Sequence, residues 1–343
     1  MTAEPAVPGS RLPPAPLRVD VFLLAGQFPG RSAGDALRDA VAYGEEAERA
    51  GFDGAWIAEH HFLRYGTCPS APALAAHLLG RTTRLRVGTA ACILSNRHPV
   101  ALAEEAALLS EVSGGRFDLG VARGGPWIDL EVFGTGLDRF RDGFAESLDL
   151  LLSWLSGDSP KVGADGKFFR FPPVDVVPAP SRRVPVYVAA TSPETAALAA
   201  ARGLPMLLGM HASAEEKSAL VGDAGVNGHV SAHVGYVAGT VGAAQEALRA
   251  AMPGWLASTG EYVRIDGTAR PRRDLDAYLQ RLLNLHPVGT VELCVDRLAE
   301  TVAVTGVRHL LLMVEGAGDA ERTLANIARL GAEVLPLLKD RCA

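Results

Sequence analysis

Three ionisable side chains, Glu59, His60 and His61, follow a short apolar run near the start of the chain. The run, Ala55 to Ala58, is typical of a strand that is buried on both faces of a parallel sheet. Barrels and open α/β sheets bind their ligands at the carboxyl ends of such strands. A carboxylate and two imidazoles at this position can act as general acids and bases, as hydrogen-bonding groups for a ligand, or as metal ligands.

Joint metal binding by the two histidines is disfavoured by their spacing. Adjacent side chains of an extended segment point in different directions, whereas the histidines of a helical zinc motif share one face. We therefore expect no metal site. A structural role for either histidine alone stays open, because histidine is often a satisfied interior residue. Their place at a strand end favours a functional role for the pair.

Cationic and hydroxyl side chains follow two later apolar runs and predict a site for an anion. Arg123 precedes Gly124-Gly125, and Arg141 comes 18 residues later near an expected helix start. Thr191, Ser192 and Thr195 surround Pro193, which suits a first helical turn. Free N–H groups and the dipole at a helix start attract phosphate, and arginine binds phosphate with two parallel hydrogen bonds. The alternative is a plain serine N-cap.

The nucleotide class follows from motifs that the chain lacks. A G-x-G-x-x-G after the first strand and a G-x-x-x-x-G-K-[ST] are both absent from the sequence, which argues against dinucleotide and P-loop sites. A phosphate site at the strand ends of a barrel suits a mononucleotide such as FMN.

Short apolar runs alternate with helical patterns along the chain, which predicts parallel βα units. We expect eight strands, each followed by helical sequence, and therefore a (β/α)8 TIM barrel with insertions after strands 4 and 7. The expected strands are 18–24, 54–59, 85–94, 116–123, 184–190, 204–209, 230–238 and 309–315. The expected helices are 32–50, 74–81, 100–112, 139–156, 241–257, 274–284 and 291–305, with a hairpin at 167–177. The polar stretch 258–273 is interpreted as a mobile lid.

Bulk properties exclude several classes of protein. The 343 residues have a net charge of −6, and dispersed Lys and Arg residues give no basic surface for nucleic acid. The four cysteines lack zinc or disulfide spacing and are expected to be reduced cytosolic thiols. No apolar run is long enough for a membrane span, and residues 1–17 are interpreted as a flexible proline-rich leader without a signal-peptide pattern. We expect one cytoplasmic domain at 18–343.

Several motifs in fixed order resemble the bacterial luciferase-like flavin monooxygenases, and most closely the luciferase α-subunit type. The resemblance covers nearly the whole chain after the leader. The motifs are Glu59-His-His-Phe62, Ala76 to Ala91, His98-Pro-Val100, Ser113 to Gly120, Arg123-Gly124, Phe133-Gly134, Ala190 to Ala200, Gly203 to Met206 and Leu285 to Thr290. It implies a (β/α)8 barrel, usually a homodimer, that uses reduced FMN and O2 to insert one oxygen atom into an organic substrate.

The resemblance also implies roles for single residues. His60 matches the active-site histidine, and Glu59 and Asp129 match polar residues near the pocket. Ala90-Ala91 matches a segment that lies against the flavin ring and can contain a cis peptide. The positions that hold the FMN phosphate correspond to Arg123, Arg141, Ser192 and Thr195, beside Thr191. Residues 258–285 match the lid, and Ala122 stands where luciferases often have a reactive cysteine.

The substrate and the electron donor are open at this level. An aldehyde or a secondary metabolite would suit an apolar pocket, for which Phe62, Trp127 and Trp255 are candidates. Because the chain has no nicotinamide fingerprint, a separate flavin reductase is expected to supply reduced FMN. Two alternatives remain: a deazaflavin-dependent oxidoreductase of the same superfamily, and a non-catalytic flavin-binding protein. Glu59 and His60 argue against the second.

Overall fold

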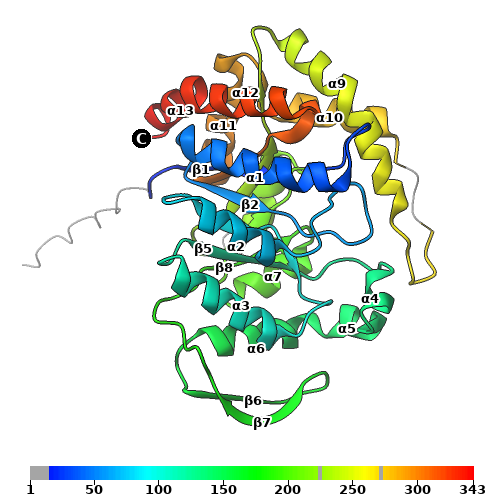
Figure 1. Ribbon diagram of the computed structural model, residues 1–343, viewed down its shortest axis with the longest axis vertical. Coiled ribbons are helices and arrows are strands. Elements are labelled where there is room, and N and C mark those ends of the chain that lie inside the picture. Colours follow the sequence, from blue (N-terminus) through cyan, green and yellow to red (C-terminus); the bar gives the residue numbers. More distant parts are fainter. Residues whose placement is uncertain (1–14, 223–225, 270–272) are drawn as a thin grey trace, which may run out of the picture.

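The computed structural model describes residues 15–222, 226–269 and 273–343, and its centre is a closed barrel of parallel strands surrounded by helices (Figure 1). Around the barrel the strands follow the order β3, β2, β1, β13, β10, β9, β8 and β5, and a pairing of β3 with β5 closes the ring. The bounds are β1 Arg18–Leu23, β2 Gly54–Ile57, β3 Arg86–Thr89, β5 Phe117–Ala122, β8 Val186–Ala190, β9 Met206–Leu208, β10 Val230–Val234 and β13 His309–Met313. The predicted (β/α)8 barrel is confirmed.

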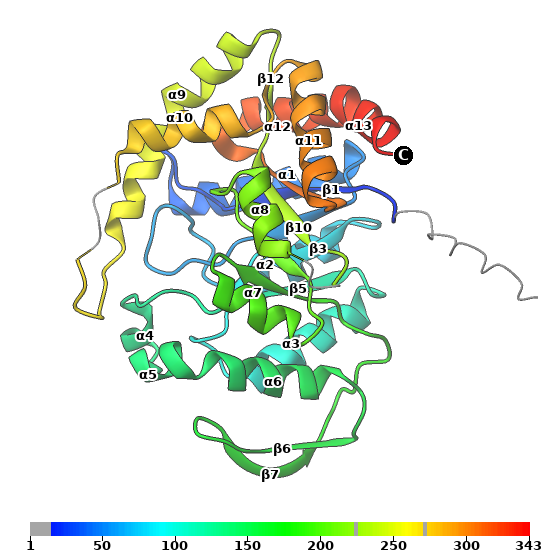
Figure 2. The ribbon, with the colours of Figure 1, turned by 180° about the vertical axis from the view of Figure 1, so that it is seen from behind.

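The helices that connect these strands form the outer layer, which is visible from both sides of the molecule (Figures 1 and 2). Their starts carry the expected side-chain caps: Ser32 forms a capping box with Asp35 at α1, and Ser192 caps α7. This layer contains α1 Ala33–Arg49, α2 Ala71–Arg81, α3 Pro99–Val112, α6 Phe144–Leu155, α7 Pro193–Ala200, α8 Ala214–Val221, α11 Val291–Thr305, α12 Ala320–Arg329 and α13 Leu335–Arg341. Two short segments, η2 Glu315–Ala317 and η3 Leu330–Val334, flank α12.

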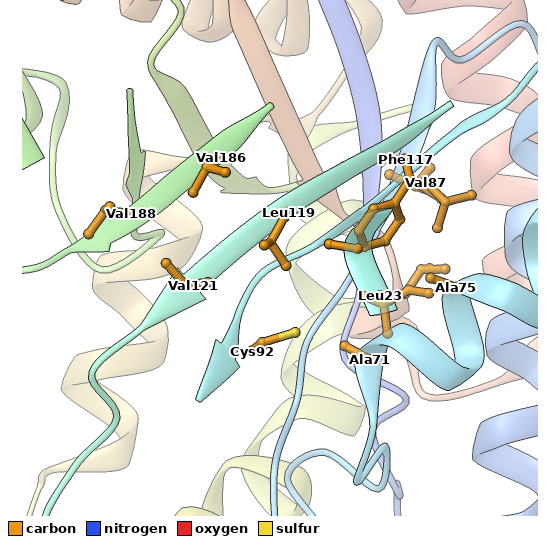
Figure 3. Close-up of a cluster of buried hydrophobic side chains, with 14 of the residues drawn as sticks. Leu23, Ala71, Ala75, Val87, Cys92, Phe117, Leu119, Val121, Val186 and Val188 are labelled. Carbon is orange, nitrogen blue, oxygen red and sulfur yellow. The ribbon is translucent and has the colours of Figure 1, made fainter. Parts of the chain in front are cut away.

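Alternating residues of each strand separate the two cores of the molecule. On β5, Phe117, Leu119 and Val121 point outward and pack with apolar residues of neighbouring strands and of α2 (Figure 3). Asp118 and Gly120 face the barrel interior between them. Because strands with both faces covered need apolar residues on the helix side and small or paired residues inside, the apolar runs of the sequence were a valid strand signal.

Two insertions interrupt the βα pattern, as predicted. Between β5 and β8 lie α4 Asp129–Val132, α5 Gly136–Asp142, α6 and an antiparallel hairpin of β6 Lys161–Asp165 and β7 Arg170–Asp175. Between β10 and β13 lie β11 Tyr236–Val237, α9 Val241–Ala257, η1 Ser258–Glu261, α10 Leu275–Leu285, β12 Val288–Gly289 and α11. The hairpin lies beyond α6 at one end of the molecule (Figure 1).

All eight barrel strands are shorter than predicted, and two of them end early for a visible reason. The strand at 85–94 is interrupted by the cis peptide bond between Ala90 and Ala91, after which β4 Cys92–Ile93 pairs with β5. The strand at 230–238 ends at Val234, because the chain leaves the barrel at Gly235 and β11 pairs with β12 instead.

Two predictions in the first insertion were wrong in their bounds. The helix expected at 139–156 consists of α5 and α6 with a break at Gly143, where a Cβ atom would lie 2.7 Å from the carbonyl oxygen of Arg139. The hairpin begins at Lys161 and not at Lys167, because the residues of β6 are mostly exposed and show no apolar alternation.

Parts of the predicted leader and lid, residues 1–14 and 270–272, lie outside the described residues. The four cysteines are free and buried. Within the described part of the chain, no helix combines the length and the apolarity that crossing a membrane requires.

Candidate active site

A cavity of about 430 Å³ opens at the carboxyl ends of the barrel strands. Its floor is apolar and comes from the inward faces of β1, β10 and β13, including Phe22, Ala232 and Leu311. Trp127 and Tyr262 lie over it with their ring centroids 4.4 Å apart. The predicted residues Glu59, His60, Ala90, Ala91, Asp129 and Thr191 line this cavity, whereas Arg123, Arg141, Ser192 and Thr195 do not line it.

Glu59 is a buried carboxylate whose two oxygens are held by donors from three segments. The backbone N–H of Ala71 donates to Oε2 at 3.2 Å, and that of Ile93 donates to Oε1 at 3.1 Å. Arg97 Nη2 also donates to Oε2 at 3.0 Å. Burial alone would raise the pKa of this carboxyl, but His61 and Arg97 outweigh burial and lower it. Glu59 is therefore ionised and ties the end of β2 to α2 and β4.

His60 lines the cavity, and its ring nitrogen Nδ1 is buried against Gly66. Its backbone N–H donates to the carbonyl oxygen of Cys68 at 3.0 Å, and its ring meets Tyr65 edge-to-face at 5.3 Å. Among the described residues, Nδ1 has no hydrogen-bond partner. Burial lowers the pKa of His60 to about 4, with a smaller effect from His61. At neutral pH the ring is uncharged and can accept or donate one proton.

Gly66 makes room for this ring. A Cβ atom at position 66 would lie 2.4 Å from His60 Nδ1, so any larger residue would displace the imidazole. His61 points elsewhere: its Nε2 lies 3.6 Å from Glu59 Oε1, beyond hydrogen-bond distance, and its ring meets Phe133 edge-to-face at 4.9 Å. The two histidines thus have separate surroundings, as their adjacent positions on an extended chain predicted.

Asp129 and the Ala90-Ala91 segment form further parts of the cavity wall. Asp129 is buried at the start of α4 and accepts hydrogen bonds from Asn96 Nδ2 at 2.8 Å and from the backbone N–H of Leu130 at 3.0 Å. The Ala90-Ala91 bond is cis, the geometry that the resemblance allowed for. Ala122 also lines the cavity and leaves it without a thiol at this point.

Arg123 and the start of α7, two parts of the predicted phosphate site, follow neighbouring strands, because β5 pairs directly with β8. Arg123 follows β5, and its guanidinium lies over the ring of Phe140 at 5.2 Å. Arg141, the residue after Phe140, is exposed and lies in the last turn of α5 rather than near a helix start. No carboxylate of the described chain pairs with either guanidinium.

The start of α7 provides the hydroxyl groups of this site. Ser192 Oγ accepts a hydrogen bond from the backbone N–H of Thr195 at 3.3 Å and lies 3.3 Å from Thr195 Oγ1. The serine N-cap and the anion-site interpretations are therefore compatible, since the cap leaves the hydroxyl groups together at a helix start.

The structure adds site residues that the sequence interpretation missed. Arg97 holds Glu59, and Tyr65 supports His60. His211 lines the cavity three residues after β9 and contacts Tyr278 of α10. His211 carries the same signal that identified His60, a histidine just beyond an apolar run, and could have been found by the same rule. Nothing local marks Arg97, because its partner is 38 residues away.

The described residues 261–263 of the predicted lid line the cavity. Ile128 N donates to the carbonyl oxygen of Val263 at 2.9 Å, and Ile265 N donates to that of Pro126 at 3.0 Å. These bonds join a segment of the second insertion to one of the first, so the two insertions together cover the cavity.

Comparison with known proteins identifies a family across most of the chain. The model of the luciferase-like monooxygenases matches residues 17–309. An alkanal monooxygenase alpha chain from the Kryptophanaron alfredi symbiont is 29% identical and covers 93% of this chain and 98% of its own length. The corresponding chain from Photobacterium phosphoreum is 31% identical and covers 92% of this chain and 97% of its own length.

Solved structures share the fold at lower identity. Monooxygenase RslO1 from Streptomyces bottropensis superposes with a TM-score of 0.81 at 22% identity, over 93% of this chain and 99% of its own. The oxygenating constituent of 3,6-diketocamphane monooxygenase from Pseudomonas putida, solved with FMN, gives 0.72 at 17% identity, over 94% and 98%. An F420-dependent secondary alcohol dehydrogenase gives 0.70 at 18% identity, over 94% and 99%.

Proposed function

The chain belongs to the luciferase-like monooxygenases, a family of flavin-dependent monooxygenases, and we propose that it uses reduced FMN and O2 to insert one oxygen atom into a small organic substrate. The observation that carries this proposal is His60: a neutral imidazole on the wall of an apolar cavity at the strand ends. Such a group can manage a proton where water is largely excluded.

The residues around the cavity fit FMN. Arg123, Arg141 and the start of α7 supply cationic and hydroxyl groups for a phosphate. Neither arginine forms an ion pair with a carboxylate of the described chain. Ala90-Ala91 offers a small, flat surface for the flavin ring. When bound, reduced FMN supplies two electrons and the position at which oxygen reacts.

The residues around the cavity would then have separate roles. Arg123, Arg141, Thr191, Ser192 and Thr195 bind and orient the cofactor. The apolar floor and the Trp127–Tyr262 cover exclude water. His60 holds or moves a proton on its imidazole ring at the cavity wall. Glu59 positions the His60 segment through its bonds to α2 and β4, and Asp129 adds a polar group at the wall.

The partners belong to the proposal as well. We expect a separate reductase to supply reduced FMN, a homodimer as the assembly, and a cytoplasmic location. The substrate would be an aldehyde or a secondary metabolite. The relatives named alkanal monooxygenase support the aldehyde, and the apolar floor of the cavity is compatible with it.

Two other functions compete with this one. The F420-dependent dehydrogenase shares the fold, which supports a deazaflavin-dependent hydride transfer without oxygen. A non-catalytic flavin-binding protein would need the phosphate and ring contacts but not a neutral His60 at the cavity wall.

Rapid mixing of the protein and photochemically reduced FMN with aerated buffer tests the proposal. Bound FMN should return to its oxidised absorbance at least about tenfold more slowly than free FMN, because the cavity restricts water and proton access. Tight FMN binding with unchanged reoxidation would instead indicate flavin storage. Binding of reduced deazaflavin without binding of FMN would identify the deazaflavin enzyme.

A further inference from the structure

His211 is a cavity residue that the proposed function does not use. It follows β9 at its carboxyl end and lines the cavity together with Gly209 and Met210. Its Nδ1 is hydrogen-bonded to the hydroxyl of Tyr278, which belongs to α10. The contact therefore connects the barrel wall to the helix that follows the lid segment.

The hydrogen bond with Tyr278 sets the proton position on His211. Burial raises the pKa of Tyr278 to about 12. The His211 side chain is partly open to solvent, and its reduced hydration at the cavity wall, together with Arg273 and Lys217, lowers its pKa. Both groups are thus uncharged at neutral pH. A phenol is a stronger donor than a neutral imidazole, so the hydroxyl donates to Nδ1 and the ring proton resides on Nε2. His211 then has an N–H donor available on its other side.

The charges around His211 are positive. The Arg273 guanidinium lies over the Tyr278 ring at 4.3 Å, and it acts on His211, Tyr278 and Tyr65. Lys217 is buried behind the wall and donates to Ser231 Oγ at 2.9 Å and to the carbonyl oxygen of Ala232 at 2.8 Å. Because burial lowers the pKa of Lys217 to about 7, it is only partly charged at neutral pH, and Arg273 is the full positive charge beside His211.

Among the described residues no carboxylate forms an ion pair with Arg273 or Lys217, and Asp274, which follows Arg273, caps α10 through its Oδ1. Glu216, next to Lys217, is paired with Arg281 at 2.7 Å. The three acidic residues that line the cavity are engaged elsewhere: Glu59 with Arg97, Asp129 with Asn96, and Glu261 with Arg64. An anionic group would therefore be stabilised at the His211 side of the wall.

The remaining wall suits a flat ring. Tyr65 lines the cavity and stacks on Trp255 with ring centroids 4.6 Å apart, which fixes its orientation. Trp127 and Tyr262 form a second aromatic pair over the opening. Aromatic faces in such pairs accept a third ring by stacking or by edge-to-face contact.

We propose that the cavity binds an aromatic substrate with an acidic oxygen, a phenolate or an aryl carboxylate, and that His211 Nε2 donates a hydrogen bond to that oxygen. Arg273 supplies the opposite charge, and Tyr278 is a positioning residue that holds the His211 tautomer. The inference rests on the proposed function, because it takes this cavity as the substrate site. It separates this chain from an enzyme for an uncharged alkanal.

Binding of matched probes in the absence of flavin tests the inference. para-Nitrophenol and its methyl ether, para-nitroanisole, differ only in the acidic oxygen, and their binding can be followed by quenching of tryptophan fluorescence. We expect the phenol to bind at least about tenfold more tightly and as the visible-absorbing phenolate, since hydrogen bonds to charged groups are the stronger ones. Benzoate against methyl benzoate tests the carboxylate in the same way. Equal affinities within both pairs would overturn the inference.

Variants assign the preference to His211. In His211→Phe the preference should fall below about twofold, and in Tyr278→Phe it should fall in part, because the tautomer is no longer held. Met210→Leu, a neighbouring cavity residue, should keep it. A preserved preference in His211→Phe, or a loss of FMN binding in its place, would overturn the inference. If His211→Phe does not fold, Tyr278→Phe decides.

The test also separates the inference from the proposed function. Because the probes are titrated without flavin, a preference that depends on His211 supports the subsite even if FMN reoxidation proves to be unprotected. Slow reoxidation with no preference between the probes would leave the monooxygenase proposal supported and refute the subsite.

Discussion

The polar groups at the two ends of the barrel interior differ in whether they have a partner within the protein. At the amino end, Asp20 and Asp118 are fully buried, and all their partners are within the protein. Arg18 bridges them at 2.6 and 3.0 Å, and Asp20 also accepts from Trp56 Nε1 at 2.7 Å and lies 2.8 Å from His309 Nε2. At the carboxyl end, His60 Nδ1 and the Arg123 guanidinium have no such partner in the described chain.

The same strand face serves both ends. Arg18, Asp20, Phe22 and Leu24 alternate along β1 and its extension, so all four point into the barrel, yet the first two form ion pairs and the last two line the cavity. Gly88 contributes to the closed end, because a Cβ atom there would lie 2.5 Å from the Trp56 ring. Paired buried groups thus mark structure, and groups left open beside a cavity mark function.

The largest effect is expected from breaking the buried ion pairs at the amino end of the barrel. Asp20→Ala should lower the free energy of unfolding by about 3–5 kcal/mol, because it removes one of the two buried carboxylates that pair with Arg18 and leaves the Trp56 N–H without a buried acceptor. Chemical denaturation of the flavin-free protein measures this change. Asp165→Ala, which removes an exposed partner of Arg170, should cost less than about 1 kcal/mol. A similar small loss at Asp20 would mean that the buried network contributes little.

Removing the unpartnered His60 should lower activity strongly and change stability little. His60→Ala should reduce substrate turnover by about 100-fold or more, the range for a lost general acid or base, while the free energy of unfolding changes by less than about 1 kcal/mol. FMN affinity should survive. His77→Ala, on the exposed side of α2, is the matched control and should leave turnover unchanged. Wild-type turnover in His60→Ala would remove His60 from the mechanism.

The sequence was sufficient for the barrel because its signals are local. Each strand is a short apolar run, and the helices predicted at 241–257 and 291–305 have these bounds in the structure. The misplaced boundaries depend on information that is not local. Gly143 breaks a helix through the backbone of Arg139, and β6 is a strand only because β7 pairs with it.

The residues of the candidate site could likewise be predicted only where the signal is local in the sequence. Glu59, His60 and Asp129 were recognised from motif positions, and they line one cavity. The donors that hold Glu59 were not predictable, since Ala71, Ile93 and Arg97 come from segments that only the closed fold brings together. His211 was missed for a different reason: its tyrosine partner lies 67 residues away, on a helix beyond the second insertion.

A smaller effect is expected from the open arginine. Arg123→Ala should weaken FMN binding by about 10- to 100-fold, the loss of charge-assisted hydrogen bonds to a phosphate. Riboflavin, which lacks the phosphate, should lose less than about threefold in equilibrium titrations. Arg170→Ala removes an exposed arginine of the hairpin and should affect neither ligand. Equal losses for FMN and riboflavin would contradict the phosphate role.

The smallest expected effect is a difference in the pH range over which His60 and Asp20 change the stability of the protein. Burial lowers the pKa of His60 from 6.5 to about 4, so between these values the unfolded chain binds a proton that the folded protein does not, and stability falls as the pH falls. Burial alone would raise the pKa of Asp20, but Arg18 and His309 hold it well below its ordinary value, so the stability that Asp20 contributes is lost only below about pH 4.

Comparing the stability of each variant with that of wild type distinguishes these two pH ranges. Relative to wild type, His60→Ala should lose less stability between pH 6.5 and 4, by at most the slope of about one proton, and should run parallel below pH 4. Asp20→Asn should run parallel above pH 4 and diverge below it. The other histidines with lowered pKa values are unchanged in both variants and cancel in the comparison. Denaturation at closely spaced pH values measures the slopes, and parallel curves throughout would mean that neither group titrates differently in the folded and unfolded protein.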